Sequence, residues 1–306
     1  MEFLFSVFTP TYNRANTIGR TYEYLCKQTL RSFEWIIVDD GSTDNTEEIV
    51  QKWINTNKIS IVYLKQENGG KHRAFNRAVQ IAKGEIFICL DSDDYYIETA
   101  LEIIYSYHLI HKDNPWIAGF SCNSLDLHGN LIGTSLPVDE LVVSHYNLYN
   151  SLSVKGDKGL IYYTRILKEY PFPEFENEFF VTEALVLNRI SLRYKICCIK
   201  RSLEIKDYQR DGLSSKYRHL CLRNPNGYAL YINERNYFNL SFTNYVINAA
   251  SYVRYSLFAG KSFRNIYKEA INRRWTFIIA CFLGILLYIN CLLYTSPSPR
   301  DKRQSR

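Results

Sequence analysis

The chain has 306 residues, of which 46% are hydrophobic, and is long enough for one large domain with an appendage or for two domains. Lysine and arginine number 37 against 31 aspartates and glutamates, and the formal net charge of +6 is too small to indicate a nucleic-acid-binding protein. The eight cysteines show no CxxC pair and lie partly in apolar runs, which indicates reduced thiols in a cytosolic protein.

Short apolar runs alternate with helical patterns in the first third of the chain. The start, "MEFLFSVFTP", has no basic region and no small-residue cleavage site, so it reads as a first strand and not as a signal peptide. We predict strands at residues 3–9, 35–38, 59–66 and 86–90, with helices at 16–30, 46–55, 72–83 and 98–111. Continuous apolar strands joined by helices through short connections predict an α/β fold with a doubly wound, mostly parallel sheet.

After residue 111 the pattern becomes mixed α and β up to about residue 215, and then the composition changes. Residues 254–274 hold six lysines or arginines against one glutamate on a helical pattern, and residues 275–294 contain no charge. About 20 apolar residues can span a bilayer, with Arg273 and Arg274 on the cytoplasmic side. Asn290, the aromatic residues and the modest length favour lying on the membrane surface over spanning it, and a buried C-terminal helix is the alternative to membrane association.

These changes divide the chain into four expected parts. We expect one domain over 1–220, with halves 1–110 and 111–220, followed by a helical basic extension over 221–274 and a membrane-associated segment over 275–294. The tail 295–306, "TSPSPRDKRQSR", resembles a cloning or sequencing scar. We expect this tail to be unstructured and the native C-terminus to be missing.

An acidic cluster follows the buried run Ile86–Leu90. Asp91, Asp93 and Asp94 repel one another, so the chain needs a cationic group at this place. Ligands of an open parallel sheet bind at the carboxyl ends of its strands. The cluster therefore lies where a ligand is expected, and a solvated loop is the alternative.

Two further loops should converge with this cluster at the same edge of the sheet. Residues 11–14 follow the first strand, and Asp39 and Asp40 follow the second. Paired carboxylates on a short loop suit a hard cation such as Mg²⁺ or Mn²⁺ that bridges substrate phosphates. Asp40 suits hydrogen bonding to a base or ribose. In the alternative reading, "DDGSTDNT" is a capped helix start with Thr43 or Asp44 as the cap.

A glycine loop, "ENGGK", opens the helix after the third strand. Gly69 and Gly70 allow close approach of a ligand to the backbone, and Lys71 and His72 can neutralise phosphate charge at the helix start. A simple turn is the alternative.

Four motifs in this order, "FTPTYNR", "IIVDDGSTDNT", "ENGGKHRAFNRAV" and "GEIFICLDSDD", resemble the family-2 glycosyltransferases of the GT-A fold. The resemblance is strong to about residue 110 and continues more weakly to "YQRDGLS" at 208–214. It implies transfer of a hexosyl or N-acetylhexosaminyl group from a nucleotide diphosphosugar, a UDP- or dTDP-sugar, with inversion and with Mn²⁺ or Mg²⁺. The implied acceptor is a glycan or a polyprenyl-linked molecule, and no nucleic acid is implied.

The resemblance also implies roles for individual residues. Asp91–Ser92–Asp93 matches the Asp-any-Asp motif of the family, which makes Asp91 and Asp93 the expected metal ligands. The residues expected to bind the nucleotide sugar are Pro10, Thr11, Tyr12, Asn13, Asp40, Gly70, Lys71 and Asp91.

The family places its catalytic base, often within Glu-Asp, at the head of a later helix. In "FENEFFVTEALVLNRI" the matching residue is Glu183, with Glu176 and Glu178 as competitors, although the Glu-Asp pair itself is absent. The alternative role of Glu183 is that of an ordinary charge at a helix start.

Together these observations predict a metal-dependent inverting glycosyltransferase that builds a cell-surface glycan at the cytoplasmic face of the cell membrane. A sugar nucleotidyltransferase is the first alternative, but it would need a glycine-rich basic loop where this chain has "PTYNRANT". A nucleotide-sugar-binding protein without turnover is the second, and it would need no catalytic base.

Overall fold

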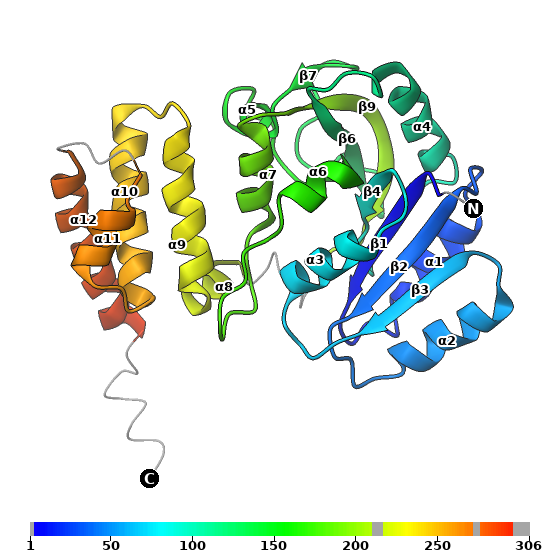
Figure 1. Cartoon of the computed structure of the whole chain (residues 1–306), viewed down its shortest axis with the longest axis horizontal. Helices are drawn as coiled ribbons and strands as arrows, with labels where there is room; N and C mark the ends of the chain where they lie inside the picture. Colours follow the sequence, from blue (N-terminus) through cyan, green and yellow to red (C-terminus); the bar gives the residue numbers. More distant parts are fainter. Residues whose placement is uncertain (1–2, 210–216, 272–275, 296–306) are drawn as a thin grey trace, which may run out of the picture. The chain divides into compact units, whose positions relative to one another are not determined.

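The computed structural model describes residues 3–209, 217–271 and 276–295 (Figure 1). Contacts between residues divide the chain into two compact units. Unit 1 consists of residues 1–172 and 186–215, and unit 2 consists of residues 173–185 and 216–306.

Unit 1 is built on one nine-stranded sheet with the strand order β3-β2-β1-β4-β8-β6-β9-β5, and β7 pairs with β9 outside this path. The strands are β1 (Phe5–Thr11), β2 (Phe33–Asp39), β3 (Ser60–Lys65), β4 (Ile86–Cys89), β5 (Tyr95–Tyr96), β6 (Ile117–Asp126), β7 (Val142–Val143), β8 (Lys158–Tyr163) and β9 (Lys195–Lys206). The first four strands are parallel, as the sequence predicts. In the second half, β8 runs antiparallel to both β4 and β6, so the complete sheet is mixed.

Helices cover both faces of the parallel part of the sheet. They are α1 (Ile18–Cys26), α2 (Thr46–Thr56) and α3 (Lys71–Ile81). On one face, Trp35 of β2 stacks with Tyr22 of α1 and Trp53 of α2. On the other face, Phe75 of α3 packs edge-on against Phe8 of β1. Strands covered on both faces have to be apolar throughout, and this explains their continuous hydrophobic runs.

Four further helices follow along the chain before β9, and they are α4 (Ala100–His111), α5 (His145–Asn150), α6 (Thr164–Glu169) and α7 (Glu183–Ser191). The predicted helices at 46–55, 72–83 and 98–111 correspond to α2, α3 and α4 within one or two residues at most ends. The predicted helix at 16–30 is shorter in the structure, because α1 ends at Cys26.

The described residues in the rest of unit 2 are mainly helical (Figure 1). These helices have their own apolar core. Its helices are α8 (Tyr217–Arg223), α9 (Pro225–Glu234), α10 (Phe242–Phe258), α11 (Phe263–Glu269) and α12 (Thr276–Thr295), with a 3₁₀ turn at Arg235–Tyr237. The basic stretch predicted over 254–274 is divided between the end of α10 and α11. Gly260 takes a left-handed φ of 72° just after α10 and ends that helix. The uncharged segment forms α12. Across the described residues, no helix has the length and apolar character needed to cross a membrane.

Three predictions fall on residues outside the described ranges. They concern residues 210–214 of "YQRDGLS", the pair Arg273 and Arg274, and the tail 296–306.

Candidate functional site

Loops at the ends of neighbouring parallel strands leave the sheet of unit 1 at one edge. In the sheet register, Thr11 at the end of β1 pairs with Asp39 at the end of β2, and Phe8 of β1 pairs with Cys89 at the end of β4. The residues that follow these strands therefore begin side by side. This is the convergence that the parallel order of the strands predicts.

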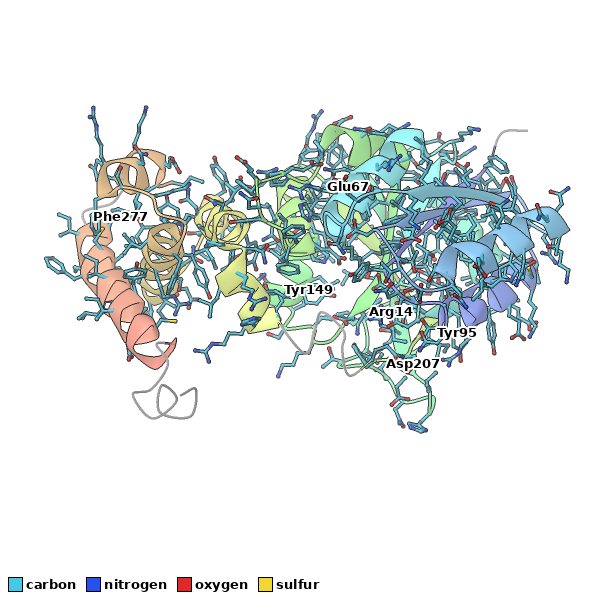
Figure 2. All side chains as sticks on the ribbon, turned by 90° about the horizontal axis from the view of Figure 1, so that it is seen from below. Arg14, Glu67, Tyr95, Tyr149, Asp207 and Phe277 are labelled. Atoms are coloured by element: carbon cyan, nitrogen blue, oxygen red, sulfur yellow. The ribbon has the colours of Figure 1, made fainter. Side chains whose placement is uncertain are left out.

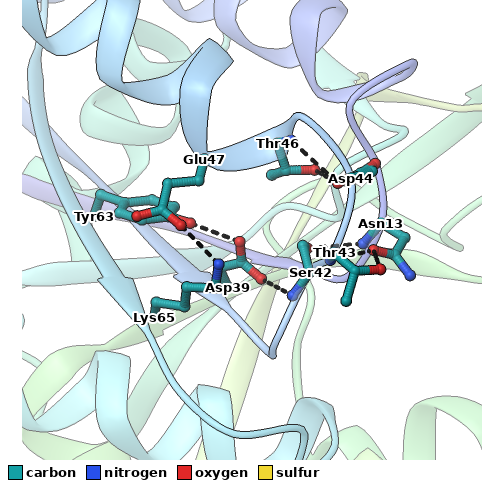
Figure 3. Close-up of polar contacts among 9 residues, drawn as sticks. All are labelled: Asn13, Asp39, Ser42, Thr43, Asp44, Thr46, Glu47, Tyr63 and Lys65. Carbon is teal, nitrogen blue, oxygen red and sulfur yellow. Dashed lines mark hydrogen bonds and ion pairs between the residues drawn. The ribbon is translucent and has the colours of Figure 1, made fainter.

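Asn13 fastens the loop after β1 to the loop after β2 (Figure 3). Its backbone N–H donates to Ser42 Oγ at 2.8 Å, and its Oδ1 accepts the N–H of Thr43 at 2.8 Å. Asn13 takes a left-handed φ of 52°, a conformation that asparagine tolerates better than most residues. The two loops thus form one unit, and the predicted contact of Asn13 with a nucleotide sugar stays a prediction.

Asp39 closes the turn after β2 and ties it to β3. Its Oδ1 accepts the N–H of Ser42 at 2.7 Å, and its Oδ2 accepts the hydroxyl of Tyr63 at 2.6 Å (Figure 3). Burial, helped by this hydrogen bond, raises the pKa of Tyr63, so its phenol remains a donor. Nothing in the local pattern around Tyr63 indicates this contact, because the two residues meet only through the pairing of β2 and β3.

Asp40 shapes the glycine loop. Its Oδ1 accepts the side-chain amide of Gln66 and the N–H of Gly69, both at 2.8 Å, and its Oδ2 accepts the N–H of Gly70 at 2.7 Å. Gly70 has a φ of 91°, which glycine adopts without strain, and α3 starts at the next residue, Lys71. Asp40 therefore positions Lys71, and its role as a ligand of the base stays a prediction.

The N-cap of α2 is Asn45, whose side chain makes no capping hydrogen bond, and not Thr43 or Asp44 as the alternative reading of "DDGSTDNT" expects; Asp44 contacts the helix start from one residue earlier. Asp44 Oδ1 accepts the hydroxyl of Thr46 at 2.6 Å and its N–H at 3.1 Å. Although burial raises the pKa of Asp44, these hydrogen bonds lower it below its usual value. Asp44 Oδ2 also accepts the N–H of Ala15, so the helix start and the joined loops are parts of one arrangement.

The acidic loop contains the cationic partner that its charge requires. Lys71 Nζ lies 2.6 Å from Asp91 Oδ1. Although burial raises the pKa of Asp91, Lys71 lowers it, with smaller contributions from Lys206 and Arg14. Asp91 is thus held as a carboxylate, and the predicted basic residue of the glycine loop reaches it.

Lys206, the last residue of β9, is a second cation that contacts the acidic loop. Its Nζ is 2.9 Å from Asp94 Oδ2 and 3.3 Å from Glu204 Oε1, and Glu204 Oε2 accepts the hydroxyl of Ser124 at 2.6 Å. Burial alone would lower the pKa of Lys206, but the surrounding carboxylates raise this pKa well above its usual value. Local sequence patterns do not reveal Lys206 or Glu204, which join the loop only through the pairing of β5 with β9.

The backbone next to Lys206 joins this network to α1. The N–H of Asp207 donates to Asp94 Oδ1 at 3.0 Å, and Asp207 Oδ2 accepts Arg20 Nη1 at 2.9 Å. The guanidinium of Arg20 lies over the ring of Tyr95, 5.9 Å from its centre. Figure 2 shows Tyr95 and Asp207 in the same region of unit 1. Asp94 is therefore fixed from several sides.

Asp93 differs from its neighbours because none of the ion pairs among the described residues includes it. Burial raises the pKa of Asp93, and the nearby negative charge of Asp91 raises it further, to about 6. The charged form of such a carboxylate would be stabilised by an additional cation. Mg²⁺ and similar ions use one or two protein carboxylates together with substrate phosphates, and the described residues contain no group of three or more possible metal ligands. The role of Asp91 and Asp93 as metal ligands stays a prediction.

At the end of β1, two of the predicted nucleotide-binding residues offer unused groups. The hydroxyl of Thr11 is buried and has no hydrogen-bond partner among the described residues. The ring of Tyr12 is 48% exposed. A buried hydroxyl without a partner is costly, so Thr11 is suited to bind a ligand.

Glu183 is the first residue of α7, as predicted, and lies partly buried in unit 2. Leu185, Val186 and Ile190 of this helix are buried, which confirms that the helix is fixed by its apolar side. The competitor Glu178 has a structural role, because its carboxylate accepts the N–H groups of Asn226 and Gly227 at 2.6 and 2.9 Å, at the start of α9.

Comparison with known proteins shows which family this part of the chain resembles. A family model described as "Glycosyl transferase family 2" matches residues 6–125, which include all three loops. Over these residues the chain is similar to the family-2 glycosyltransferases. Its sheet with helices on both faces is the GT-A fold that the motifs predict.

Curated relatives carry names of the same class. The chain is 35% identical over 149 residues to the glycosyltransferase GlyG of Streptococcus pneumoniae, a match covering 47% of this chain and 48% of GlyG. It is 32% identical over 200 residues to TarS of Staphylococcus aureus, a poly(ribitol-phosphate) β-N-acetylglucosaminyltransferase, covering 61% of this chain and 34% of TarS. The chain thus spans about half or less of the length of these relatives.

Solved structures support the fold over nearly the whole chain. The crystal structure of TarS residues 1–349 in complex with UDP-GlcNAc has a TM-score of 0.60 at 20% identity, covering 93% of this chain and 89% of that one. A mannosyltransferase of Pyrobaculum calidifontis in complex with GDP-Man and Mn²⁺ has a TM-score of 0.55 at 15% identity, covering 96% and 88%. At these identities the likeness shows the fold alone.

Proposed function

We propose that the chain is an inverting glycosyltransferase that moves a sugar from a nucleotide diphosphosugar to a hydroxyl group of a cell-surface glycan or lipid-linked acceptor. The observation that carries the proposal is the unequal charge balance of the acidic loop. Lys71 and Lys206 are paired with Asp91 and Asp94, whereas Asp93 has no ion-pair partner among the described residues. A divalent metal ion beside Asp93 would supply the missing positive charge and would also hold the diphosphate of the donor.

The donor is a UDP- or dTDP-sugar that carries a hexosyl or N-acetylhexosaminyl group. TarS, with a related sequence and the same fold, was solved with UDP-GlcNAc. The buried hydroxyl of Thr11 and the exposed ring of Tyr12 support a nucleotide at the end of β1. The residues proposed to bind the donor are Pro10, Thr11, Tyr12, Asn13, Asp40, Gly70, Lys71 and Asp91.

Asp91 and Asp93 are the proposed ligands of Mn²⁺ or Mg²⁺. A similar fold, the Pyrobaculum mannosyltransferase, was solved with Mn²⁺. When bound, the metal supplies positive charge against the negative charge that develops on the departing nucleoside diphosphate. Lys71 contributes a second positive charge close to Asp91, and Lys206 and Glu204 keep the loop in place from behind.

Glu183 is the proposed general base. Its position at the start of α7 places a carboxylate at the positive end of a helix dipole. An ionised carboxylate can take the proton from an acceptor hydroxyl as this oxygen attacks the anomeric carbon. Glu178 cannot take this role without leaving the start of α9 uncapped, because its oxygens accept two backbone N–H groups there.

The proposed location is the cytoplasmic face of the cell membrane. The uncharged helix α12 and the basic sequence before it support membrane attachment, and an acceptor linked to a polyprenyl lipid would be presented at this surface.

Incubation of the purified chain with radiolabelled UDP- and dTDP-sugars, Mn²⁺ and lipid or glycan acceptors tests the proposal. We expect labelled acceptor and free nucleoside diphosphate, and neither from Asp93→Asn. Release of pyrophosphate from a nucleoside triphosphate and a sugar phosphate would instead show a nucleotidyltransferase. Donor binding without transfer or hydrolysis, for all donors and acceptors, would indicate a binding protein.

A further inference from the structure

The helix α12 is apolar on both its sides. Its buried side includes Phe277, Ala280 and Gly284. Its opposite side exposes seven large apolar residues and carries no charge, and these residues are Ile278, Ile279, Phe282, Leu283, Leu286, Leu287 and Ile289. A helix at a water-exposed surface has a polar outer face, whereas a helix that is apolar all round needs an apolar partner there.

Among the described residues, α10 occupies one side of α12, which leaves the opposite side available to such a partner. A Cβ added at Gly284 would lie 2.7 Å from Ala250 O and 2.7 Å from Val253 Cβ, so the two helices pack in close contact. On the outer side, an apolar groove runs between α10 and α12, and its lining includes Ile247, which is 60% exposed. The exposed apolar surface therefore extends over both helices.

The short helix α11 adds charge at one end of this surface. Tyr267 of α11 contacts Phe277 at the start of α12, with ring centres 6.1 Å apart. Ile266 of α11 faces the core, while Phe263 and Tyr267 are more than half exposed. Arg264 and Lys268 are exposed as well, at the next positions along the same side. Exposed aromatic and basic side chains close to the start of an apolar helix match the interface of an anionic bilayer.

We infer that the exposed sides of α11 and α12, together with the groove between α10 and α12, form a surface that binds to an anionic lipid bilayer. The apolar side chains enter the boundary between headgroups and acyl chains, and Arg264 and Lys268 contact lipid phosphates. The inference rests on the proposed function only for the membrane location. It assigns that location to particular residues and describes α12 as lying on the bilayer with α10 along its other side.

A second copy of this chain fits the surface less well. In a symmetric pair, the same patch from each copy meets the other. The uncharged residues could pair in this way, but Arg264 and Lys268 would add only positive charge to both sides. Anionic headgroups complement them.

Vesicle sedimentation with the full chain tests the inference. The probes are vesicles of phosphatidylcholine alone and vesicles in which one quarter of the lipid is phosphatidylglycerol. We expect binding to the anionic vesicles, and we expect the double variant Phe282→Asp/Leu286→Asp to lose it at least tenfold. The double variant Arg264→Gln/Lys268→Gln should weaken it roughly 10- to 30-fold, since each basic residue near the surface contributes about fivefold. High salt should remove this second difference.

Matched controls separate this surface from general effects of charge. Ile110→Asp on α4 introduces a charge at an apolar residue that is 63% exposed, and Lys52→Gln/Lys58→Gln removes two exposed lysines. Both controls should bind like the unchanged chain. Equal binding by all variants overturns the inference, and so does a lack of binding by the unchanged chain. If the chain self-associates without binding vesicles, and Phe282→Asp/Leu286→Asp abolishes that self-association, the surface is an interface between copies and the inference is also overturned. The assay contains no donor, so its failure and a failure of sugar transfer are distinguishable.

Discussion

Lys206 Nζ lies 2.9 Å from Asp94 Oδ2, so a buried ammonium near the end of β9 holds the residue that directly follows Asp93. The same ammonium is 3.3 Å from Glu204 Oε1. Bringing three charges out of water is costly, and such groups rarely add stability over apolar side chains of the same volume. Their benefit here is geometric, because they fix the acidic loop from the side that faces away from solvent.

The first prediction concerns this buried ammonium. Lys206→Met should lower the free energy of unfolding by about 3–5 kcal/mol, because it leaves Asp94 and Glu204 as buried carboxylates without a counter-charge. Urea denaturation followed by fluorescence measures the loss. Adding Asp94→Asn and Glu204→Gln to the variant should restore much of the stability, since the uncompensated charges are then removed.

The control for Lys206 is Lys27→Met, which removes the exposed ion pair with Glu23. Its unfolding midpoint should match that of the unchanged chain. A Lys206→Met protein that unfolds at the same urea concentration as this control would show that the buried contacts have no positioning role.

Local patterns were sufficient to predict the part of the fold that carries the site. The runs at Ile36 and Ile88 are continuous and apolar because helices cover both faces of their strands, and parallel order then places their loops at one edge. The need for a cation near Asp91 also followed from local charge, and Lys71 supplies it.

Contacts between distant segments could not be predicted in this way. Lys206 is 112 residues from Asp94 in the chain, and the two meet only because the short strand β5 pairs with the end of β9. Asp40 and Glu178 gave no sign of their structural roles either. A carboxylate that accepts backbone N–H groups is identical in the sequence to one that binds a ligand.

The second prediction concerns pH and the metal. The pKa of Asp93 is raised to about 6, so the folded chain holds this proton more tightly than the unfolded one. Asp93 should therefore stabilise the metal-free protein at low pH, and this contribution should be lost as the pH rises from about 4 to above about 6. Metal binding requires the ionised form, so Mn²⁺ should raise the melting temperature more at about pH 7.5 than at about pH 5.

Asp93→Asn should abolish both the pH dependence of the Mn²⁺ effect and the transfer of sugar. Asp113→Asn changes an exposed aspartate after α4 and should alter neither. A melting temperature that responds to Mn²⁺ equally at both pH values, in the unchanged chain and in Asp93→Asn, would place the metal elsewhere. Transfer at full rate in excess EDTA would remove the metal from the mechanism.

The third prediction separates two roles of Asp40. Asp40→Ala leaves the N–H groups of Gly69 and Gly70 without their acceptor, and should lower the stability by about 1–3 kcal/mol. If Asp40 also binds the base, the affinity for UDP should fall in Asp40→Asn as well. Calorimetric titration with UDP and thermal denaturation of both variants, with Glu48→Ala on α2 as an exposed control, decide this. A stability loss with unchanged UDP affinity would limit Asp40 to shaping the loop.

Glu176 and Glu178 provide internal controls for the catalytic base. Glu176 is exposed, and Glu176→Gln should leave both stability and turnover unchanged. Glu178→Gln weakens the hydrogen bonds to the N–H groups of Asn226 and Gly227, and should cost about 1 kcal/mol of stability with at most a small effect on turnover.

The fourth prediction concerns Glu183 itself. Glu183→Gln keeps the size of the side chain and its place at the start of α7, but a glutamine cannot accept the proton of an acceptor hydroxyl. Turnover should fall by about 10²–10⁴-fold, the range that general-base catalysis provides, while the affinity for the nucleotide sugar stays near that of the unchanged chain. Calorimetry with the donor and a product assay on the three glutamate variants measure both quantities. A Glu183→Gln enzyme with normal turnover would show that another group takes the proton, and a parallel loss of donor affinity would point to a role in binding.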